Sequence, residues 1–179
     1  LFRSSTVSAV LDNTAPTLSG ISNSSSPVKT KSWTWSCSDA SSCTFRHVID
    51  QSAGTTFSSE AFDSTSTDSQ SSGDGTYYLH VQAKDAAGNL SSVVTVSAAL
   101  DNTAPTISGI SDSSSPVKTK SWTWSCSDTS SCTFRHVIDQ SAGTTFSSEA
   151  FDSTTTDSQS SGDGTYYLHV QAKDAAGNL

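Results

Sequence analysis

The sequence is poor in the features that mark several large classes of protein. It has no methionine, four prolines, and nine lysine and arginine residues against 17 aspartate and glutamate residues, which gives a formal net charge of −8. This acidic balance argues against a nucleic acid as partner, because phosphate binding needs clustered lysine and arginine. No stretch approaches the ~20 apolar residues that a membrane helix needs, so we expect no membrane insertion of this segment.

Signals of helices and of catalytic sites are also missing. No segment shows the 3.6-residue apolar period of an amphipathic helix. A Ser–His–Asp site is disfavoured, because no Gly-x-Ser-x-Gly motif occurs and both His47 and His80 fall on predicted strands. The two glutamates, Glu60 and Glu149, lie 89 residues apart in serine-rich stretches, which disfavours the paired carboxylates of a glycosidase. We therefore expect no catalytic residues and no enzyme activity, with His47 half-buried and His80 exposed on a sheet face.

What the sequence does contain is a long internal repeat. Residues 12–90 and 101–179 are offset by 89 positions and differ at four places only: Leu18/Ile107, Asn23/Asp112, Ala40/Thr129 and Ser66/Thr155. A unit of this length is too long for a solenoid coil and suits one small domain. Near-identical copies also argue against an enzyme. We predict three parts: residues 1–11 as the last strand of a preceding repeat, 12–100 as the first repeat, and 101–179 as the second repeat.

The four cysteines form one pair per repeat, Cys37/Cys43 and Cys126/Cys132, with the same spacing. An even count at a repeated spacing, in a chain that looks extracellular, predicts one local disulfide per repeat. A ring this small would stabilise the fold by ~2 kcal/mol on the chain-entropy model. Zinc binding is the competing interpretation, although the spacing is not Cys-x-x-Cys and no second pair of ligands follows.

Short stretches of alternating apolar and polar residues between turn clusters predict β-strands. In the first repeat these are residues 17–22, 31–39, 43–50, 75–85 and 90–100. The Ser/Thr-rich stretch 55–70 is expected to hold two more. About seven short strands in 89 residues predict an all-β fold of two tandem immunoglobulin-like β-sandwiches, the second lacking its own last strand.

The run "SGDGTYYLHVQAKDAAGNLS" at residues 72–91, preceded by "LDNTAPT" at 11–17, resembles the bacterial immunoglobulin-like and fibronectin-type-III-like tandem repeats of large surface proteins and adhesins. The resemblance covers the whole 89-residue unit, although the cysteine pair is not general in that family. It implies an extracellular, cell-surface location and a structural role as a stalk or fibre repeat, with units stacked end to end.

A second function stays open beside the structural one. Each sandwich could instead be an adhesive module that recognises a glycan or a protein, which would make a host or target cell surface its partner. Repetition would then raise avidity. Tyr78 and Tyr167, expected on an exposed sheet face, are the residues at which such a ligand would bind.

Acidic and amide side chains are expected to meet at one end of the sandwich, near the joint that "LDNTAPT" forms between repeats. Asp101 and Asn102 belong to that joint, Asp128 to the loop between the cysteines, and Asp174 and Asn178 to the "KDAAGN" turn. Calcium takes six to eight oxygen ligands, so these residues form a candidate Ca²⁺ site that would stiffen the array. The alternative is that they only cap turns, because no Asp-x-Asp-x-Asp-Gly loop is present to decide the matter.

The two ends of the chain correspond to each other. Residues 1–11 align with residues 90–100, and residue 179 also aligns with residue 90. We expect one of two outcomes. Either the chain is cut from a longer continuous fibre, or residues 1–10 fill the vacant sheet edge of a neighbouring copy, head to tail. In the second case Ser5, Val7 and Ala9 would take the places of Val94, Val96 and Ala98, which is a less apolar set.

Overall fold

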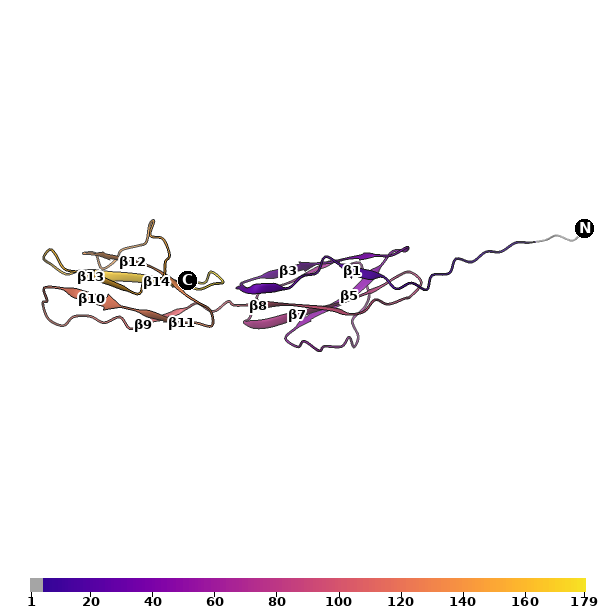
Figure 1. The fold of residues 1–179 in the computed structure, drawn as a ribbon, viewed down its shortest axis with the longest axis horizontal. Helices are drawn as coiled ribbons and strands as arrows, with labels where there is room; N and C mark the ends of the chain where they lie inside the picture. Colours follow the sequence, from indigo (N-terminus) through magenta and orange to yellow (C-terminus); the bar gives the residue numbers. More distant parts are fainter. Residues whose placement is uncertain (1–4) are drawn as a thin grey trace, which may run out of the picture. The chain divides into compact units, whose positions relative to one another are not determined.

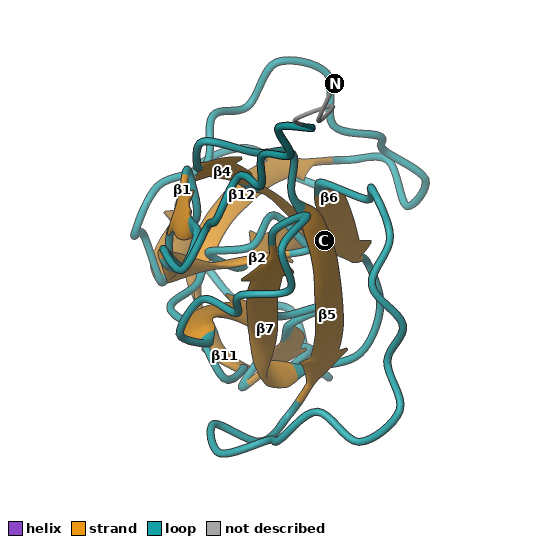
Figure 2. Cartoon of the chain, turned by 90° about the vertical axis from the view of Figure 1, so that its right-hand side faces the viewer, coloured by secondary structure: helices purple, strands orange, loops and turns teal. Residues whose placement is uncertain are grey.

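The computed structural model describes residues 5–179, and within this range it contains strands, turns and loops but no helix (Figures 1 and 2). The contacts divide the chain into two compact units. The first holds most of the first repeat, to Ala98, and the second begins at Ala99 and includes two short segments, 26–29 and 72–74. Nothing in residues 5–179 forms a helix of the length and hydrophobicity that crossing a bilayer requires. The prediction of an all-β fold is confirmed.

The first repeat has eight strands: β1 (Thr17–Ser19), β2 (Ser24–Val28), β3 (Lys31–Thr34), β4 (Ser36–Ser38), β5 (Thr44–Asp50), β6 (Thr67–Gln70), β7 (Gly75–Lys84) and β8 (Val94–Leu100). They form one sheet in the order β2-β8-β7-β5 and two pairs, β1-β4 and β3-β6. β5 runs antiparallel to β7, from the pair Thr44↔Lys84 to the pair Asp50↔Tyr78.

The second repeat has six strands: β9 (Thr106–Ser108), β10 (Lys120–Thr123), β11 (Ser125–Ser127), β12 (Thr133–Asp139), β13 (Thr156–Gln159) and β14 (Tyr167–Lys173). They form three antiparallel pairs, β9-β11, β10-β13 and β12-β14. None of these six strands is the repeat equivalent of β8, and the segment equivalent to β2 is not a strand.

A common apolar core holds the layers of each sandwich together. In the second unit Trp122, Trp124, Phe134 and Ala172 are buried, and partly buried side chains from β9, β12 and β14 pack against them. The ring of Trp124 meets that of Phe134 edge to face, with centroids 6.4 Å apart. The equivalent aromatic residues of the first repeat are buried as well. Because the core side chains come from different strand pairs, the pairs face one another as layers.

Two strand predictions are corrected at the aromatic core. The predicted strand 31–39 is divided at Trp35, because β3 pairs with β6 whereas β4 pairs with β1. The chain passes between layers there, and the backbone N–H of Trp35 donates to the carbonyl of Ser66 at 3.0 Å. In the stretch 55–70, only β6 forms, together with an isolated bridge between Phe45 and Asp63, so the prediction of two strands is wrong.

β2 is a strand that the sequence patterns did not indicate. It brings the first repeat to eight strands, where about seven were predicted. Its sequence, "SSSPV", has neither alternation nor aromatic residues, and Pro27 argues against a strand. Proline is tolerated at the edge of a sheet, where its missing N–H costs no ladder bond. β2 is the outermost strand of its sheet, next to β8.

The prediction that His80 is exposed is wrong. Its side chain is 1% exposed, with Nδ1 bonded to the Thr95 hydroxyl and Nε2 to the Ser52 carbonyl, both at 2.9 Å. The reason is that β7 is a central strand: β5 and β8 flank it, and the chain that follows β5 reaches its outer side. Tyr78 is likewise half-buried, whereas His47 is half-buried as expected.

Candidate metal centre

The "KDAAGN" turn that follows β7 is built around one carboxylate. Oδ1 of Asp85 accepts the backbone N–H groups of Gly88 and Asn89, at 2.7 and 2.8 Å. Oδ2 accepts the side-chain amide of Asn89 at 2.7 Å. Gly88 has a φ of +97°, a conformation that side chains other than glycine's rarely allow. The turn therefore fixes Asp85, which is 4% exposed, with both oxygens engaged.

The loop between the cysteines carries the second acidic residue. Disulfides join Cys37 to Cys43 and Cys126 to Cys132, each with its Cα atoms 6.5 Å apart, so the predicted pairing is confirmed. The zinc interpretation is wrong, because all four sulfurs are in disulfides. Inside the second ring, Oδ2 of Asp128 accepts the backbone N–H and the hydroxyl of Ser130, at 2.9 and 2.8 Å. Two hydrogen bonds from Ser130 thus hold the Asp128 carboxylate in place within the disulfide-closed loop.

The linker residue Asp101 is the third acidic group. It lies next after β8 and is 4% exposed. Its Oδ1 accepts the backbone N–H of Thr103 at 3.3 Å, and its carbonyl oxygen accepts the side-chain amide of Asn178 at 3.0 Å. The same amide donates to Oδ2 of Asp174 at 2.6 Å. One asparagine therefore ties the linker to the "KDAAGN" turn of the second repeat.

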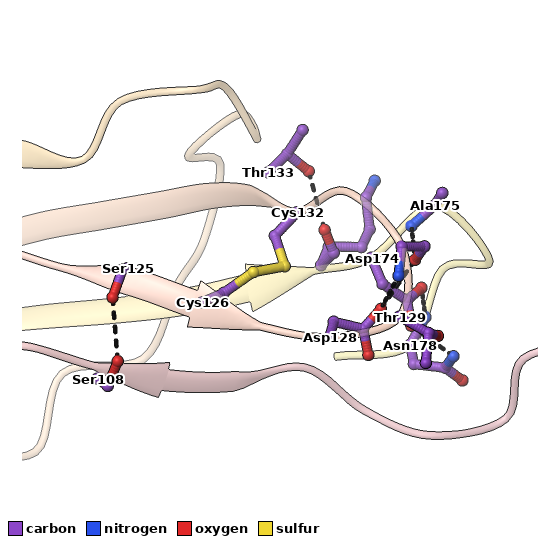
Figure 3. The surroundings of a disulfide bond; sticks show 12 residues. Ser108, Ser125, Cys126, Asp128, Thr129, Cys132, Thr133, Asp174, Ala175 and Asn178 are labelled. Carbon is purple, nitrogen blue, oxygen red and sulfur yellow. Dashed lines mark hydrogen bonds between the residues drawn. A yellow bond between two sulfur atoms is a disulfide. The ribbon is translucent and has the colours of Figure 1, made fainter.

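These three carboxylates converge, as the sequence predicted. One oxygen from each of Asp101, Asp128 and Asp174 lies within 4.8 Å of the other two. We call this set the second-repeat cluster. Figure 3 shows the Cys126–Cys132 disulfide in the same region as Asp128, Thr129, Asp174 and Asn178. Three like charges this close repel one another, and a bound cation would offset that repulsion.

The first repeat holds the same arrangement. Asp12, Asp39 and Asp85 also bring one oxygen each within 4.8 Å of the others, and we call them the first-repeat cluster. The sequence-based prediction covered only the residues of the second-repeat cluster. The 89-residue offset was the signal that would have found this twin, because each of its members is the exact repeat equivalent of a predicted one.

The two predicted asparagines have different places in the structure. Asn178 lies inside the cluster but presents a donor nitrogen to Asp174 and to the linker carbonyl, which gives it a positioning role. Asn102 is engaged elsewhere: its side-chain amide donates to the carbonyl of Gly73 at 2.8 Å, and its backbone N–H donates to Asp74 at 2.6 Å. The acidic residues are thus the candidate ligands that the fold brings together.

Hydrogen bonds favour the charged forms of two cluster residues. For Asp85, burial raises the pKa, but the bonds from Asn89 and Gly88 outweigh this effect and hold the pKa below its ordinary value of 3.8. For Asp128, the backbone N–H and the hydroxyl of Ser130 lower the pKa, against smaller opposing effects of burial and of the nearby Asp74. Both groups are therefore anionic at neutral pH, as a cation site requires.

One of the four differences between the repeats falls at this site. In the second repeat the Thr129 hydroxyl donates to Oδ2 of Asp101 at 3.2 Å. The first repeat has Ala40 in that position, which offers no such donor to Asp12. The second-repeat cluster therefore has one more internal hydrogen bond than the first-repeat cluster. A comparison of the two clusters would show the effect of that bond.

The sequence matches no protein-family model and no curated protein. Among solved structures, the chain is similar to the chicken CNTN1 FN1-FN3 domains, with 14% identity and a TM-score of 0.38 over 92% of this chain. It spans 63% of the length of that chain. It is also similar to the fibronectin(III)-like modules of Clostridium thermocellum CbhA, with 16% identity and a TM-score of 0.36, over 91% of this chain and 87% of that one.

The titles of these two structures name FN1-FN3 domains and fibronectin(III)-like modules. The description of this chain as a pair of β-sandwich repeats rests on its own strands, pairings and core.

Proposed function

We propose that this chain is a structural repeat of an extracellular bacterial surface protein or adhesin, where sandwiches stacked end to end form a stalk or fibre. The observation that carries this proposal is that both repeats keep the same core, disulfide and acidic cluster, while the few differences between them preserve their structural roles. A stalk gains length from copies and needs no specialised surface on any one of them.

The nature of two of the four differences supports this. At Ser66/Thr155 the backbone carbonyl accepts the N–H of a core tryptophan in both repeats, at 3.0 Å, so the side chain is of little consequence. Leu18/Ile107 is an apolar exchange opposite a disulfide cysteine, on β1 or β9. Neither change creates a new binding surface.

The disulfides support an extracellular location. Bonds of this kind form and persist in oxidising compartments and are rare in the cytosol of most organisms. Two small domains with net negative charge and one disulfide each suit the outside of a cell.

The acidic clusters suit Ca²⁺, which would strengthen the joint between repeats. Each cluster joins one linker aspartate to two loops of the following sandwich, so a cation bound there would clamp the linker to the sandwich. Carboxylates, main-chain carbonyls and water are the ligands that calcium takes. We would expect binding to raise the melting temperature, because a ligand that binds only the folded state stabilises it.

A calcium titration separates binding from turn capping. The wild-type chain should melt at a higher temperature in millimolar Ca²⁺ than in chelator. Asp128→Asn should reduce the increase by about half, because the first-repeat cluster remains. Thr129→Ala is the matched control: it gives the second cluster the residue of the first and should keep the full increase. No change in melting temperature with Ca²⁺ would show that the carboxylates serve as caps alone.

The adhesive alternative is less well supported. Tyr167 is 38% exposed, but its equivalent in the first repeat, Tyr78, is half-buried, so the repeats do not share an exposed tyrosine. A glycan array and a pull-down from target-cell surfaces, both with the full chain, test the proposal directly. Specific, saturable binding would overturn a purely structural role, and the absence of such binding is what we expect.

A further inference from the structure

One long connection in each repeat is held against the sandwich although it contains no strand. In the first repeat it is residues 51–66, between β5 and β6, and we call it the strap. Connections of more than about 12–15 residues without secondary structure are uncommon in compact domains, and are usually either functional or disordered. The side chains of Thr55, Phe57 and Phe62 are half-buried, so the strap packs against the fold.

Aromatic rings and cations hold the strap on β5 and β7. Cζ of Arg46 on β5 lies 4.5 Å from the ring centroid of Phe57 and 5.0 Å from that of Phe62. Nζ of Lys84 on β7 lies 4.3 Å from the ring centroid of Phe62. A cation at this distance is attracted by the negative face of an aromatic ring. We call these four residues the cation–π stack.

β7 fixes the direction of the Arg46 side chain. Arg46 follows the core residue Phe45, so its side chain lies on the outer face of the sheet. There Oε1 of Gln82 accepts hydrogen bonds from Nε and Nη2 of Arg46, at 3.0 and 2.6 Å. The side-chain amide of Gln82 donates to the carbonyl of Ser91 at 2.8 Å, and Gln82 is 9% exposed. The guanidinium is therefore held in one orientation, in which both phenylalanine rings contact it.

The strap also occupies part of the open edge of β5. This strand is the outermost of the sheet β2-β8-β7-β5, so its main-chain groups on one side have no partner within that sheet. At Phe45 the strap supplies a partner: the backbone N–H groups of Phe45 and Asp63 each donate to the carbonyl of the other, at 2.7 and 2.8 Å. Nε2 of His80 on β7 donates to the carbonyl of Ser52 at 2.9 Å. A strand from outside could therefore pair along the whole of β5 only by displacing the strap.

The second repeat has the same strap at residues 140–155. Cζ of Arg135 lies 4.6 Å from the ring centroid of Phe146 and 5.0 Å from that of Phe151. Nζ of Lys173 lies 4.5 Å from the ring centroid of Phe151. The hydrogen bonds from the arginine to its glutamine recur as well, and so does the bridge at the edge strand. Each repeat therefore carries its own strap and its own cation–π stack.

We propose that the strap is a cover, fastened by the cation–π stack, that prevents β5 of one copy of this chain from pairing with β5 of another copy. An exposed edge strand is a template for pairing with another chain, and natural proteins cover such edges. Two identical edges can pair about a two-fold axis, so a second copy is the partner that fits an uncovered β5. This goes beyond the proposed function, which concerns the length of the chain and not its contacts with other copies.

Loss of the guanidinium should release the strap. Arg46→Met combined with Arg135→Met removes, in each repeat, the cation that two rings contact, while an unbranched side chain is kept. Chymotrypsin, which cleaves after aromatic residues, should then cut within residues 51–66 and 140–155 at least tenfold faster than in the wild-type chain. Mass spectrometry of the fragments locates the cuts.

The matched control is Lys31→Met combined with Lys120→Met. It removes the same charge from cation–π contacts with tryptophan rings outside the strap, at 5.9 and 5.8 Å, and it should be cut at the wild-type rate. Phe57→Leu combined with Phe146→Leu is a milder variant that keeps the arginine–glutamine hydrogen bonds. It should be cut at an intermediate rate, and it keeps the test decisive if the arginine variant does not fold.

Sedimentation velocity measures the consequence at the edge strand. The arginine variant should form dimers at a concentration at least tenfold lower than the wild-type chain and the lysine control, and amide hydrogens of β5 and β12 should exchange more slowly in those dimers. Unchanged cleavage, cleavage only outside the two straps, or a released strap without increased association would each overturn the proposal. The wild-type chain could still be elongated in each of these cases, so the proposed function can stand or fail separately.

Discussion

At the scale of single residues, the acidic clusters are held in place by a small number of short hydrogen bonds. Asp174 shows this best: its Oδ1 accepts the backbone N–H of Asn178 at 2.8 Å and its Oδ2 accepts the side-chain amide of the same residue. Both residues are buried. The Asp174 carboxylate thus holds the turn in place whether or not a cation is bound. Its effect on the turn can therefore be measured separately from its effect on cation binding.

Replacing Asp174 by alanine should destabilise the second repeat in calcium-free buffer. Two buried donors of Asn178 would lose their acceptor, which costs about 1–3 kcal/mol of unfolding free energy. Asp112→Asn is the control, because it installs the residue that the first repeat already has, and it should change stability by less than about 0.5 kcal/mol. Urea unfolding of the three proteins gives the comparison, and equal stability of all three would contradict the role assigned to Asp174.

Acid should destabilise both repeats. The pKa values of Asp63 and Asp152 are lowered from 3.8, chiefly by the backbone N–H groups of Thr65 and Thr154, and those of Asp85 and Asp128 are lowered too. The folded chain therefore binds fewer protons than the unfolded chain. The stabilisation that these four aspartates contribute is present above pH 3.8. It is lost as the pH falls through their lower pKa values in the folded state. Melting temperatures measured between pH 6 and pH 2 should fall mainly below pH 4; a flat profile there would contradict these shifts.

At the scale of elements, alternation identified most strands because the buried side chains follow it. Trp33, Phe45 and Leu79 all fall on predicted inward faces and are buried. The pattern failed where tertiary context decides. It could not show that β7 has neighbours on both sides and cover on its outer face, which buries His80, or that "SSSPV" becomes an edge strand. The cluster could be predicted because each of its aspartates lies in a linker or turn that the sequence itself marks. The orientation of the Asn102 side chain could not be predicted, because it depends on a tertiary contact with Gly73.

β14 should be less stable than β7, although their sequences are nearly identical, because among the described residues it pairs with β12 alone. Amide hydrogens of β14 should exchange faster, because one edge of this strand has no partner in the described part of the chain. Most peptides from the two repeats have equal masses, so the measurement needs peptides that include Ser66 or Thr155, which differ in mass. The protein must be dilute enough to be monomeric. Equal protection of both strands under that condition would contradict this account.

At the scale of the whole molecule, near-identity of the repeats is the property that needs explanation. Each repeat carries its own core, its own disulfide and its own acidic cluster next to the linker. A chain of such units can be lengthened by adding copies, and no new kind of contact is required. This suits a segment whose role is to span a distance.

Small-angle X-ray scattering of the full chain, extrapolated to zero concentration, tests the structural role most directly. A sandwich is roughly 35–40 Å long, at ~3.3 Å per strand residue plus loops, so two units end to end should reach about 70–80 Å with a radius of gyration of about 22 Å or more. A single compact body of this chain length would have a radius of gyration near 16 Å. The elongated value, kept or increased in Ca²⁺, is the predicted result. A value near that of a compact body would contradict the proposal that the repeats form a stalk.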